Sequence, residues 1–113
     1  MEITVHDPFL WQAFNPGVPF PQGGCQAANT MIAVAPDGRV YPCPALPVLL
    51  GRLGTSSLKE IVASPAKKEF RLGLLEYPAG CAGCPEIHIC KGGCRGRAFA
   101  AHGSLNERDP GCK

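Results

Sequence analysis

The sequence predicts a small α+β domain stapled by metal, with a β-hairpin followed by short helices and a cysteine-rich loop region. Three observations support this fold class: a β-branched segment that reverses at a Pro-Asp-Gly turn, several helix-capping signals, and seven cysteines in only 113 residues. A chain of this length buries a modest core, and 14 glycines and 12 prolines make it rich in loops. Such a chain usually needs additional cross-links, either disulfides or bound metal.

The N-terminal part contains one helix signal. Asp7 can cap a helix that begins with Pro8, because proline at the first helical position leaves no N–H unsatisfied. Three aromatic residues, Trp11, Phe14 and Phe20, are expected to pack in the core, with docking on a partner as the alternative. The proline-rich sequence that follows predicts an extended connector, so residues 1–23 are interpreted as an N-terminal arm.

The next segment predicts a β-hairpin that brings two cysteines together. Residues 30–34 and 39–41 are short runs of β-forming residues, and the sequence between them contains Pro36 and Gly38. Cys25 precedes the first run and Cys43 follows the second. Because antiparallel strands place these two ends side by side, the hairpin is expected to deliver both thiolates to one place.

Three helices are predicted after the hairpin. Ser57 and Glu60 form a capping box, which predicts a helix start. Ser64 caps a second helix, which Gly73 is expected to disturb or end. Residues 95–101 favour a third helix, and the turn at Asp109-Pro110-Gly111 then returns the last cysteine to the others.

Composition limits the class of protein. The formal net charge of +2 gives no support for a nucleic-acid binder, which normally has a clear basic excess. The first residues lack the pattern of a signal peptide, and no apolar run reaches transmembrane length. These observations predict a cytoplasmic protein with no membrane contact. In that reducing compartment thiols more often hold metal than form disulfides, and an odd number of cysteines also disfavours full pairing.

The spacing of the cysteines carries the chemical information. The upstream pair reads Cys25-x12-Gly38-x4-Cys43, and the downstream group reads Cys81-x2-Cys84-x5-Cys90-x3-Cys94 before a final Cys112. Soft thiolates suit zinc or iron–sulfur clusters. By itself this donor set leaves both open.

This order and spacing resemble the SPASM domain, the C-terminal auxiliary-cluster domain of many radical S-adenosylmethionine enzymes that modify peptides and proteins. Similar members include the pyrroloquinoline quinone synthesis enzyme and anaerobic sulfatase maturases. The resemblance also includes Gly51-Arg52-Leu53-Gly54, Gly93-Cys94-Arg95-Gly96 and Asp109-Pro110-Gly111-Cys112. It spans residues 24–113, which we take as the SPASM-like domain.

The resemblance implies up to two iron–sulfur clusters, of the 4Fe–4S type. The second auxiliary cluster would be bound by Cys81, Cys84, Cys90 and Cys112. The first would be bound by Cys25, Cys43 and Cys94, so that Cys94 crosses from its neighbours to the other site. The fourth ligand of the first site is missing from the sequence: that iron could be open, the site could be incomplete, or the ligand could be Met31, His6 or His88.

Basic residues flank the cysteine group. Lys91, Arg95 and Arg97 are interpreted either as a solvated basic face or as groups that offset cluster charge or bind an acidic partner.

The chain lacks the CxxxCxxC motif of radical S-adenosylmethionine chemistry, so it is not expected to be catalytic alone. Its initial methionine slightly favours a free-standing partner of a radical enzyme over an excised domain. We expect an accessory module for electron transfer or peptide positioning, whose partners are that enzyme and its peptide substrate. The alternatives are a zinc-binding interaction module and, last, a thiol oxidoreductase using Cys81 and Cys84, which would need an absent βαβ context.

Overall fold

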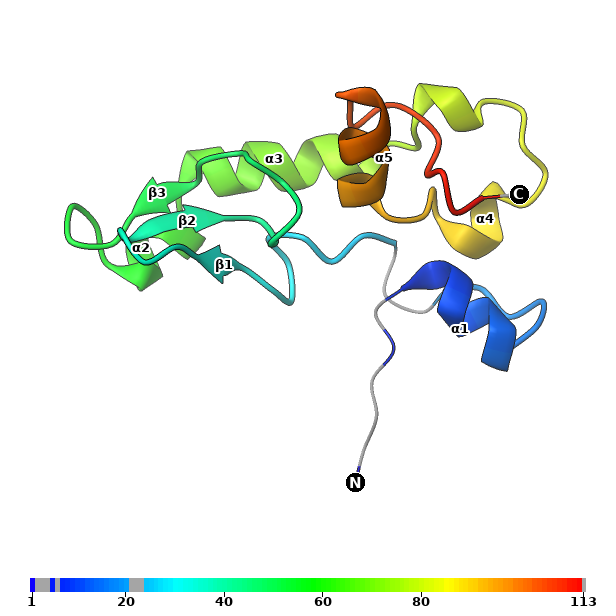
Figure 1. Cartoon of the computed structure of the whole chain (residues 1–113), viewed down its shortest axis with the longest axis horizontal. Helices are drawn as coiled ribbons and strands as arrows, with labels where there is room; N and C mark the ends of the chain where they lie inside the picture. Colours follow the sequence, from blue (N-terminus) through cyan, green and yellow to red (C-terminus); the bar gives the residue numbers. More distant parts are fainter. Residues whose placement is uncertain (2–4, 6, 21–23, 113) are drawn as a thin grey trace. The chain divides into compact units, whose positions relative to one another are not determined.

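The computed structural model describes residues 1, 5, 7–20 and 24–112 of the chain. It has a small α+β fold, as predicted, and divides into two compact units. Gln26–Glu76 contains the β-sheet and is called the sheet unit below. Met1–Cys25 together with Tyr77–Lys113 is called the terminal unit. Figure 1 labels the strands and the α-helices of the two units.

The predicted hairpin is present in the sheet unit. Strand β1, Ala33–Val34, pairs antiparallel with β2, Arg39–Tyr41. Gly38 has φ of 91°, a left-handed conformation that glycine adopts without steric cost. The Asp37 carboxylate accepts the Arg39 backbone N–H at 3.1 Å, which fixes the turn between the strands.

A third strand, β3, was not predicted from the sequence. Gly51–Arg52 pairs antiparallel with β2 and completes a sheet of order β1-β2-β3. The strand is only two residues long and starts with a glycine, so it carries no alternating pattern. The glycine has a packing reason, because a Cβ at Gly51 would lie 2.8 Å from Cγ1 of Ile61.

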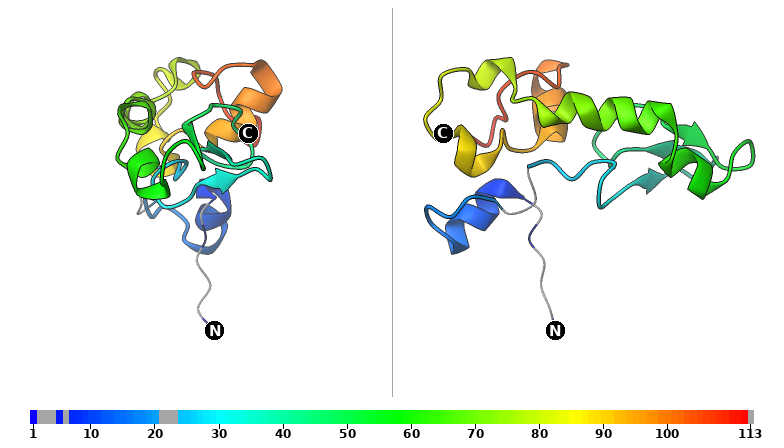
Figure 2. Two further views of the ribbon diagram at one scale, coloured as in Figure 1. Left: turned by 90° about the vertical axis from the view of Figure 1, so that its left-hand side faces the viewer. Right: turned by 180° about the vertical axis from the view of Figure 1, so that it is seen from behind.

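Two helices follow the sheet, and α3 runs alongside it in Figure 2. Helix α2, Leu58–Val62, has the predicted capping box: Glu60 N–H donates to Ser57 Oγ at 3.1 Å, and Ser57 N–H donates to Glu60 Oε1 at 3.2 Å. Helix α3 covers Pro65–Leu75 and is capped by Ser64, as predicted.

The expectation that Gly73 disturbs or ends α3 is wrong, because the helix continues to Leu75. A glycine inside a helix costs only about 1 kcal/mol relative to alanine. The buried Leu74 side chain anchors the last turn and offsets this cost.

The core of the sheet unit is apolar and contains side chains of β2, α2, α3 and the segments next to the other strands. Buried residues of the loop before β1, of the sheet and of α2 pack against each other, with partly buried side chains around them. The buried members are Ala28, Val40, Leu50 and Ile61, and the surrounding side chains are Ile32, Leu53 and Phe70.

The terminal unit begins with α1, Pro8–Phe14, whose predicted N-cap is confirmed because Asp7 accepts the N–H groups of Phe9 and Leu10. Phe20 is buried and meets Trp11 edge-on, with ring centroids 6.2 Å apart. Core packing was also expected for Phe14, and there the expectation is wrong, since 72% of that residue is exposed.

Three short helices complete the terminal unit. They are η1, Ala79–Cys81, α4, Ile87–Cys90, and α5, Arg95–His102. Helix α1 packs against α4. Helix α5 confirms the third predicted helix, and Gly103 ends it in a left-handed conformation. Among the described residues, no helix has the length and apolar character needed to cross a membrane.

Candidate metal centre

Four of the predicted ligands share one pocket in the terminal unit. Cys81, Cys84, Cys90 and Cys112 line it, together with Phe9, Ile87, Gly92, Arg108 and Asp109. The four thiols come from η1, the loop after it, the end of α4 and the end of the chain. The fold thus gathers cysteines that lie up to 31 positions apart in the sequence.

Local turns explain how the first two thiols reach the pocket. Cys81 N–H donates to the Pro78 carbonyl at 2.9 Å, and Cys84 N–H donates to the Cys81 carbonyl at 3.1 Å. Gly83 has φ of 75°, a conformation that few other residues adopt. These contacts form the tight knuckle expected of a CxxC ligand pair.

The second half of the cysteine group depends on a left-handed stretch. Helix α4 ends at Cys90, and then Lys91, Gly92 and Gly93 all have positive φ, of 56°, 91° and 71°. This reversal separates Cys90 from Cys94, which is the N-cap of α5. The segment from Cys90 to Cys94 thus combines a sharp turn with a helix start.

The C-terminal turn carries the last thiol. Gly111 N–H donates to Asp109 Oδ1 at 2.8 Å, and Cys112 N–H donates to the Asp109 carbonyl at 2.9 Å. The predicted turn is therefore confirmed.

Burial raises the pKa of Cys81, and the neighbouring thiols Cys90, Cys112 and Cys84 raise it further, while Arg108 opposes them. Negative charge on several of these sulfurs is therefore unfavourable unless a cation offsets it. A pocket with four cysteine thiols and this property fits an iron–sulfur cluster or zinc.

Within the described ranges, no three His, Cys, Asp or Glu side chains are gathered closely enough for a single metal ion. Four thiolates on one tetrahedral zinc would lie about 3.8 Å apart, given a Zn–S bond of about 2.3 Å. A four-iron cluster is larger and is bound by one thiolate at each iron.

The other three predicted ligands belong to different units. Cys25 and Cys94 are in the terminal unit and Cys43 is in the sheet unit, two positions after the end of β2. Their assignment to one site remains a prediction. Of the three candidates for the missing ligand, His88 is exposed on α4, Met31 is partly buried in the sheet unit, and His6 lies outside the described residues.

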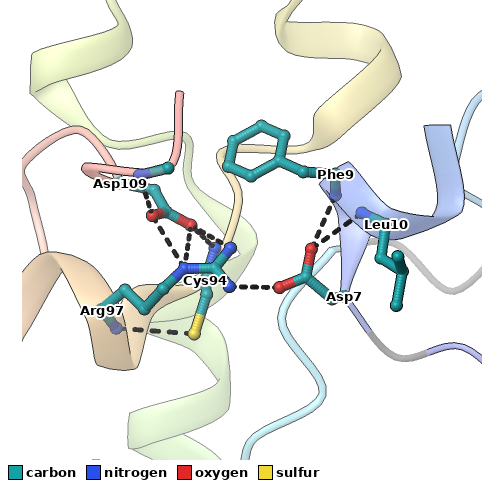
Figure 3. Close-up of polar contacts among 7 residues, drawn as sticks. Asp7, Phe9, Leu10, Cys94, Arg97 and Asp109 are labelled. Carbon is teal, nitrogen blue, oxygen red and sulfur yellow. Dashed lines mark hydrogen bonds and ion pairs between the residues drawn. The ribbon is translucent and has the colours of Figure 1, made fainter. Parts of the chain in front are cut away.

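An ion-pair network lies beside the pocket, and Figure 3 shows its members. Arg97 donates through Nη2 to Asp109 Oδ2 at 2.8 Å and through Nε to Oδ1 at 3.0 Å, while Nη1 donates to Asp7. Asp109 Oδ2 also accepts the Cys94 backbone N–H at 2.6 Å. Arg97 N–H donates to the Cys94 sulfur at 3.5 Å.

Asp109 is only 1% exposed, and its contacts keep it charged. Burial raises the pKa of Asp109, but hydrogen bonds from Arg97, Cys94 and Gly111 outweigh this effect and hold the pKa below its usual value. Burial also raises the pKa of Asp7, but hydrogen bonds, above all the one from Arg97, outweigh burial and lower it. Hydrogen bonds to Asp109 and Asp7 raise the pKa of Arg97, and they outweigh burial, which lowers it.

The interpretation as a solvated basic face is wrong for Arg95, which is buried, and Arg97 is ion-paired although 41% of its side chain is exposed. Arg97 is engaged by two carboxylates, and Arg95 is buried with its Nη1 donating to the Leu105 carbonyl at 2.8 Å. Sequence reasoning missed Asp7 and Asp109 as partners of Arg97. From the sequence, Asp7 was expected only to cap a helix and Asp109 only to form a turn. Their positions relative to Arg97 do not match the short spacings at which helix side chains meet.

Comparison with known proteins identifies the family of this chain. Residues 25–85 match SPASM, an iron–sulfur cluster-binding domain. The chain belongs to the SPASM family. That description names iron–sulfur and lends no support to the zinc alternative. The matched segment includes Cys25, Cys43, Cys81 and Cys84.

Two relatives are enzymes by name. The chain is 32% identical over 98 residues to an AdoMet-dependent heme synthase of Methanosarcina barkeri, covering 79% of this chain and 25% of that protein. It is 38% identical over 90 residues to a PqqA peptide cyclase of Methylocella silvestris, covering 75% of this chain and 24% of that protein. The chain thus spans about a quarter of the length of these relatives.

The fold is similar to that of a solved structure described as His6-tagged anSMEcpe with bound AdoMet. The TM-score is 0.54 at 26% identity, and the match covers 90% of this chain and 28% of the other. This likeness agrees with the family assignment.

Proposed function

We propose that this SPASM domain supports a radical S-adenosylmethionine enzyme in peptide or protein modification, through electron transfer, substrate positioning or both. The observation that carries the proposal is the single pocket lined by Cys81, Cys84, Cys90 and Cys112. One relative also supports the proposal, because the PqqA peptide cyclase is named for a peptide substrate. The domain itself has no CxxxCxxC motif, so the radical-generating step belongs to another domain or chain.

The four pocket cysteines are proposed to hold a 4Fe–4S cluster, which supplies reversible one-electron transfer when it is bound. The chain's own part begins with proton release, because thiols must lose their protons to ligate and the pKa of Cys81 is raised. Arg108 lowers that pKa and helps this thiolate to form. Loading of the site is therefore expected to be favoured at higher pH.

Cys25, Cys43 and Cys94 are proposed to bind the first auxiliary cluster in a three-thiolate site. Because its fourth ligand is not supplied by cysteine, an open iron there could contact a substrate peptide. A site that uses Cys94 would also couple the two clusters, since Cys94 lies only four positions after Cys90. The protein is proposed to act in the cytoplasm.

Anaerobic reconstitution of the whole chain tests the cluster assignment. Iron, sulfide and zinc are counted, and the reduced protein is examined by EPR. Cys84→Ser is expected to remove the signal of the four-thiolate cluster and about four irons. Cys94→Ser should instead affect the three-thiolate site.

Two results would contradict the proposal. Stoichiometric zinc without iron would overturn the iron–sulfur assignment. Loss of the four-thiolate cluster in Cys94→Ser, with the other site retained, would show that the division of ligands is wrong.

A further inference from the structure

The phenyl ring of Phe9 forms part of the wall of the four-cysteine pocket. Phe9 lies on α1, yet it lines the pocket together with cysteines that lie 72 or more positions later in the chain. It is partly buried, whereas Phe14 on the same helix is largely exposed. The two phenylalanines of α1 thus have different surroundings, and one faces the thiols.

Two glycines make room for this ring. A Cβ at Gly93 would lie 3.1 Å from Cζ of Phe9, and a Cβ at Gly111 would lie 3.2 Å from its Cδ2. The φ of Gly93 is 71°, so backbone conformation also requires a glycine there, but Gly111 has no such positive φ. Space for the ring, and for the adjacent Asp109 carboxylate, is therefore the reason for glycine at position 111.

Each of these glycines directly precedes a cysteine. Gly93 is followed by Cys94 and Gly111 by Cys112, which are the predicted ligands of the two different sites. The Phe9 ring therefore packs against the backbone immediately before Cys94 and immediately before Cys112.

Charged groups hold the ring in this place. The Arg97 guanidinium lies over the phenyl ring, 5.6 Å from its centroid. Arg97 is in turn fixed by Asp109 and by Asp7, and Asp7 caps the helix that carries Phe9. Figure 3 shows the ring beside this network.

On the basis of the function proposed above, we propose that Phe9 is the solvent shield of the four-thiolate cluster, positioned by the network of Asp7, Arg97 and Asp109. An apolar wall controls solvent access to a metal site and thereby its stability and potential. Reduction adds negative charge, which water stabilises better than a phenyl ring does. The ring therefore keeps the potential low and slows loss of iron.

The test compares Phe9→Ala with Phe14→Ala, a matched loss of a phenyl group on the same helix, in the full chain reconstituted without oxygen. Both variants are expected to take up as much iron as the unchanged protein. Phe9→Ala should release iron to a chelator about 10-fold faster, because the supporting shell of a metal site commonly contributes 10- to 100-fold. Its midpoint potential, followed by EPR, should be higher, and Phe14→Ala should change neither quantity.

Equal release rates and potentials in the two variants would overturn the proposal. If Phe9→Ala does not fold, Phe9→Leu takes its place, since leucine keeps an apolar side chain but covers less area. Its iron release should lie above that of Phe14→Ala, and equality would again be contrary to the proposal.

Gly111→Ala gives an independent test from the other side of the contact. The added methyl group should displace the ring and accelerate iron release in the unchanged background. In Phe9→Ala the same change should have a much smaller effect, because the ring it displaces is gone. Equal effects in both backgrounds would mean that Gly111→Ala does not act through the Phe9 ring, which would contradict the proposal.

A measurement without metal distinguishes failure of the shield from failure of the proposed function. In the apo protein, mass spectrometry follows alkylation of Cys112, which is expected to be faster in Phe9→Ala than in Phe14→Ala. If the unchanged chain binds no iron but this difference is found, the proposed function fails and the packing role of Phe9 stands. If iron is bound and the difference is missing, the shield fails alone.

Discussion

The sheet unit and the terminal unit are stabilised by different interactions. In the sheet unit, Val40, Leu50 and Ile61 pack in an apolar core, and the sheet and a capping box supply hydrogen bonds. The terminal unit instead surrounds a group of thiols with short helices, positive-φ turns and the ion pairs of Arg97. The first arrangement can be stable by itself, while the second gathers groups that repel each other when ionised.

The comparison separates folding by apolar burial from folding by ligand binding. Hydrophobic burial contributes about 25 cal/mol per Å² whether or not metal is present. The thiol pocket adds stability when a cation offsets the charge of its thiolates, whereas the ion pairs of Arg97 stabilise the terminal unit with or without metal.

Removing metal should affect the two units unequally. Structural metal binding can contribute roughly 10 kcal/mol to folding. After chelation, hydrogen exchange is expected to accelerate strongly at Cys90 and in α5 but to stay slow at Val40 and Leu50. Similar protection of the terminal unit in both forms would mean that metal does not stabilise it.

Leu50→Ala should affect the opposite unit. Leu50 is 6% exposed, and truncation of a buried leucine costs about 2–5 kcal/mol. Hydrogen exchange of the sheet should accelerate while iron content in the terminal unit is retained. The control is Leu49→Ala, since Leu49 is 55% exposed and should tolerate the change.

Asp109→Asn should destabilise the terminal unit by about 1–3 kcal/mol, because it weakens the charged hydrogen bonds to Arg97 and the Cys94 N–H. Trp11, the single tryptophan of the chain, lies in this unit and reports its unfolding by fluorescence. Asp37→Asn is the control, since the Asp37 ion pairs are at the exposed hairpin turn of the sheet unit. A Trp11 transition unchanged in Asp109→Asn would show that this network is not stabilising.

Acid should act on the terminal unit through the same carboxylates. The pKa values of Asp7 and Asp109 are lowered in the folded protein, so their contribution is present above the unfolded value of about 3.9 and is lost as pH falls through the folded values. The Trp11 transition of the apo protein should therefore weaken between about pH 5 and pH 2. The loss should be smaller in Asp7→Asn, and an identical pH profile would argue against this linkage.

The smallest expected effect is at the start of α2. Ser57→Ala removes the acceptor of the Glu60 N–H and should cost about 1 kcal/mol of sheet-unit stability. Thr55→Ala, two positions earlier in an exposed turn, is the control. Hydrogen exchange in α2 measures the difference, and equal rates in the two variants would mean that the cap is not needed.

Much of the local structure was predictable because its causes lie within a few residues. Pro36 and Gly38 specify the hairpin turn, and Asp7, Ser57 and Ser64 specify helix starts through side chains that bond to N–H groups nearby. The spacing of the cysteines also indicated the family, because metal ligands recur at fixed spacings in the sequence.

The tertiary structure decided what depends on distant partners. The strand at Gly51 forms because β2 offers it hydrogen bonds, and α3 passes Gly73 because burial of Leu74 offsets the cost of the glycine. The pairing of Arg97 with Asp7 joins residues 90 positions apart, and the contact of Phe9 with Gly111 joins residues still further apart. No local pattern encodes such contacts, because their free energy comes from burial and charge that exist only after the chain has folded.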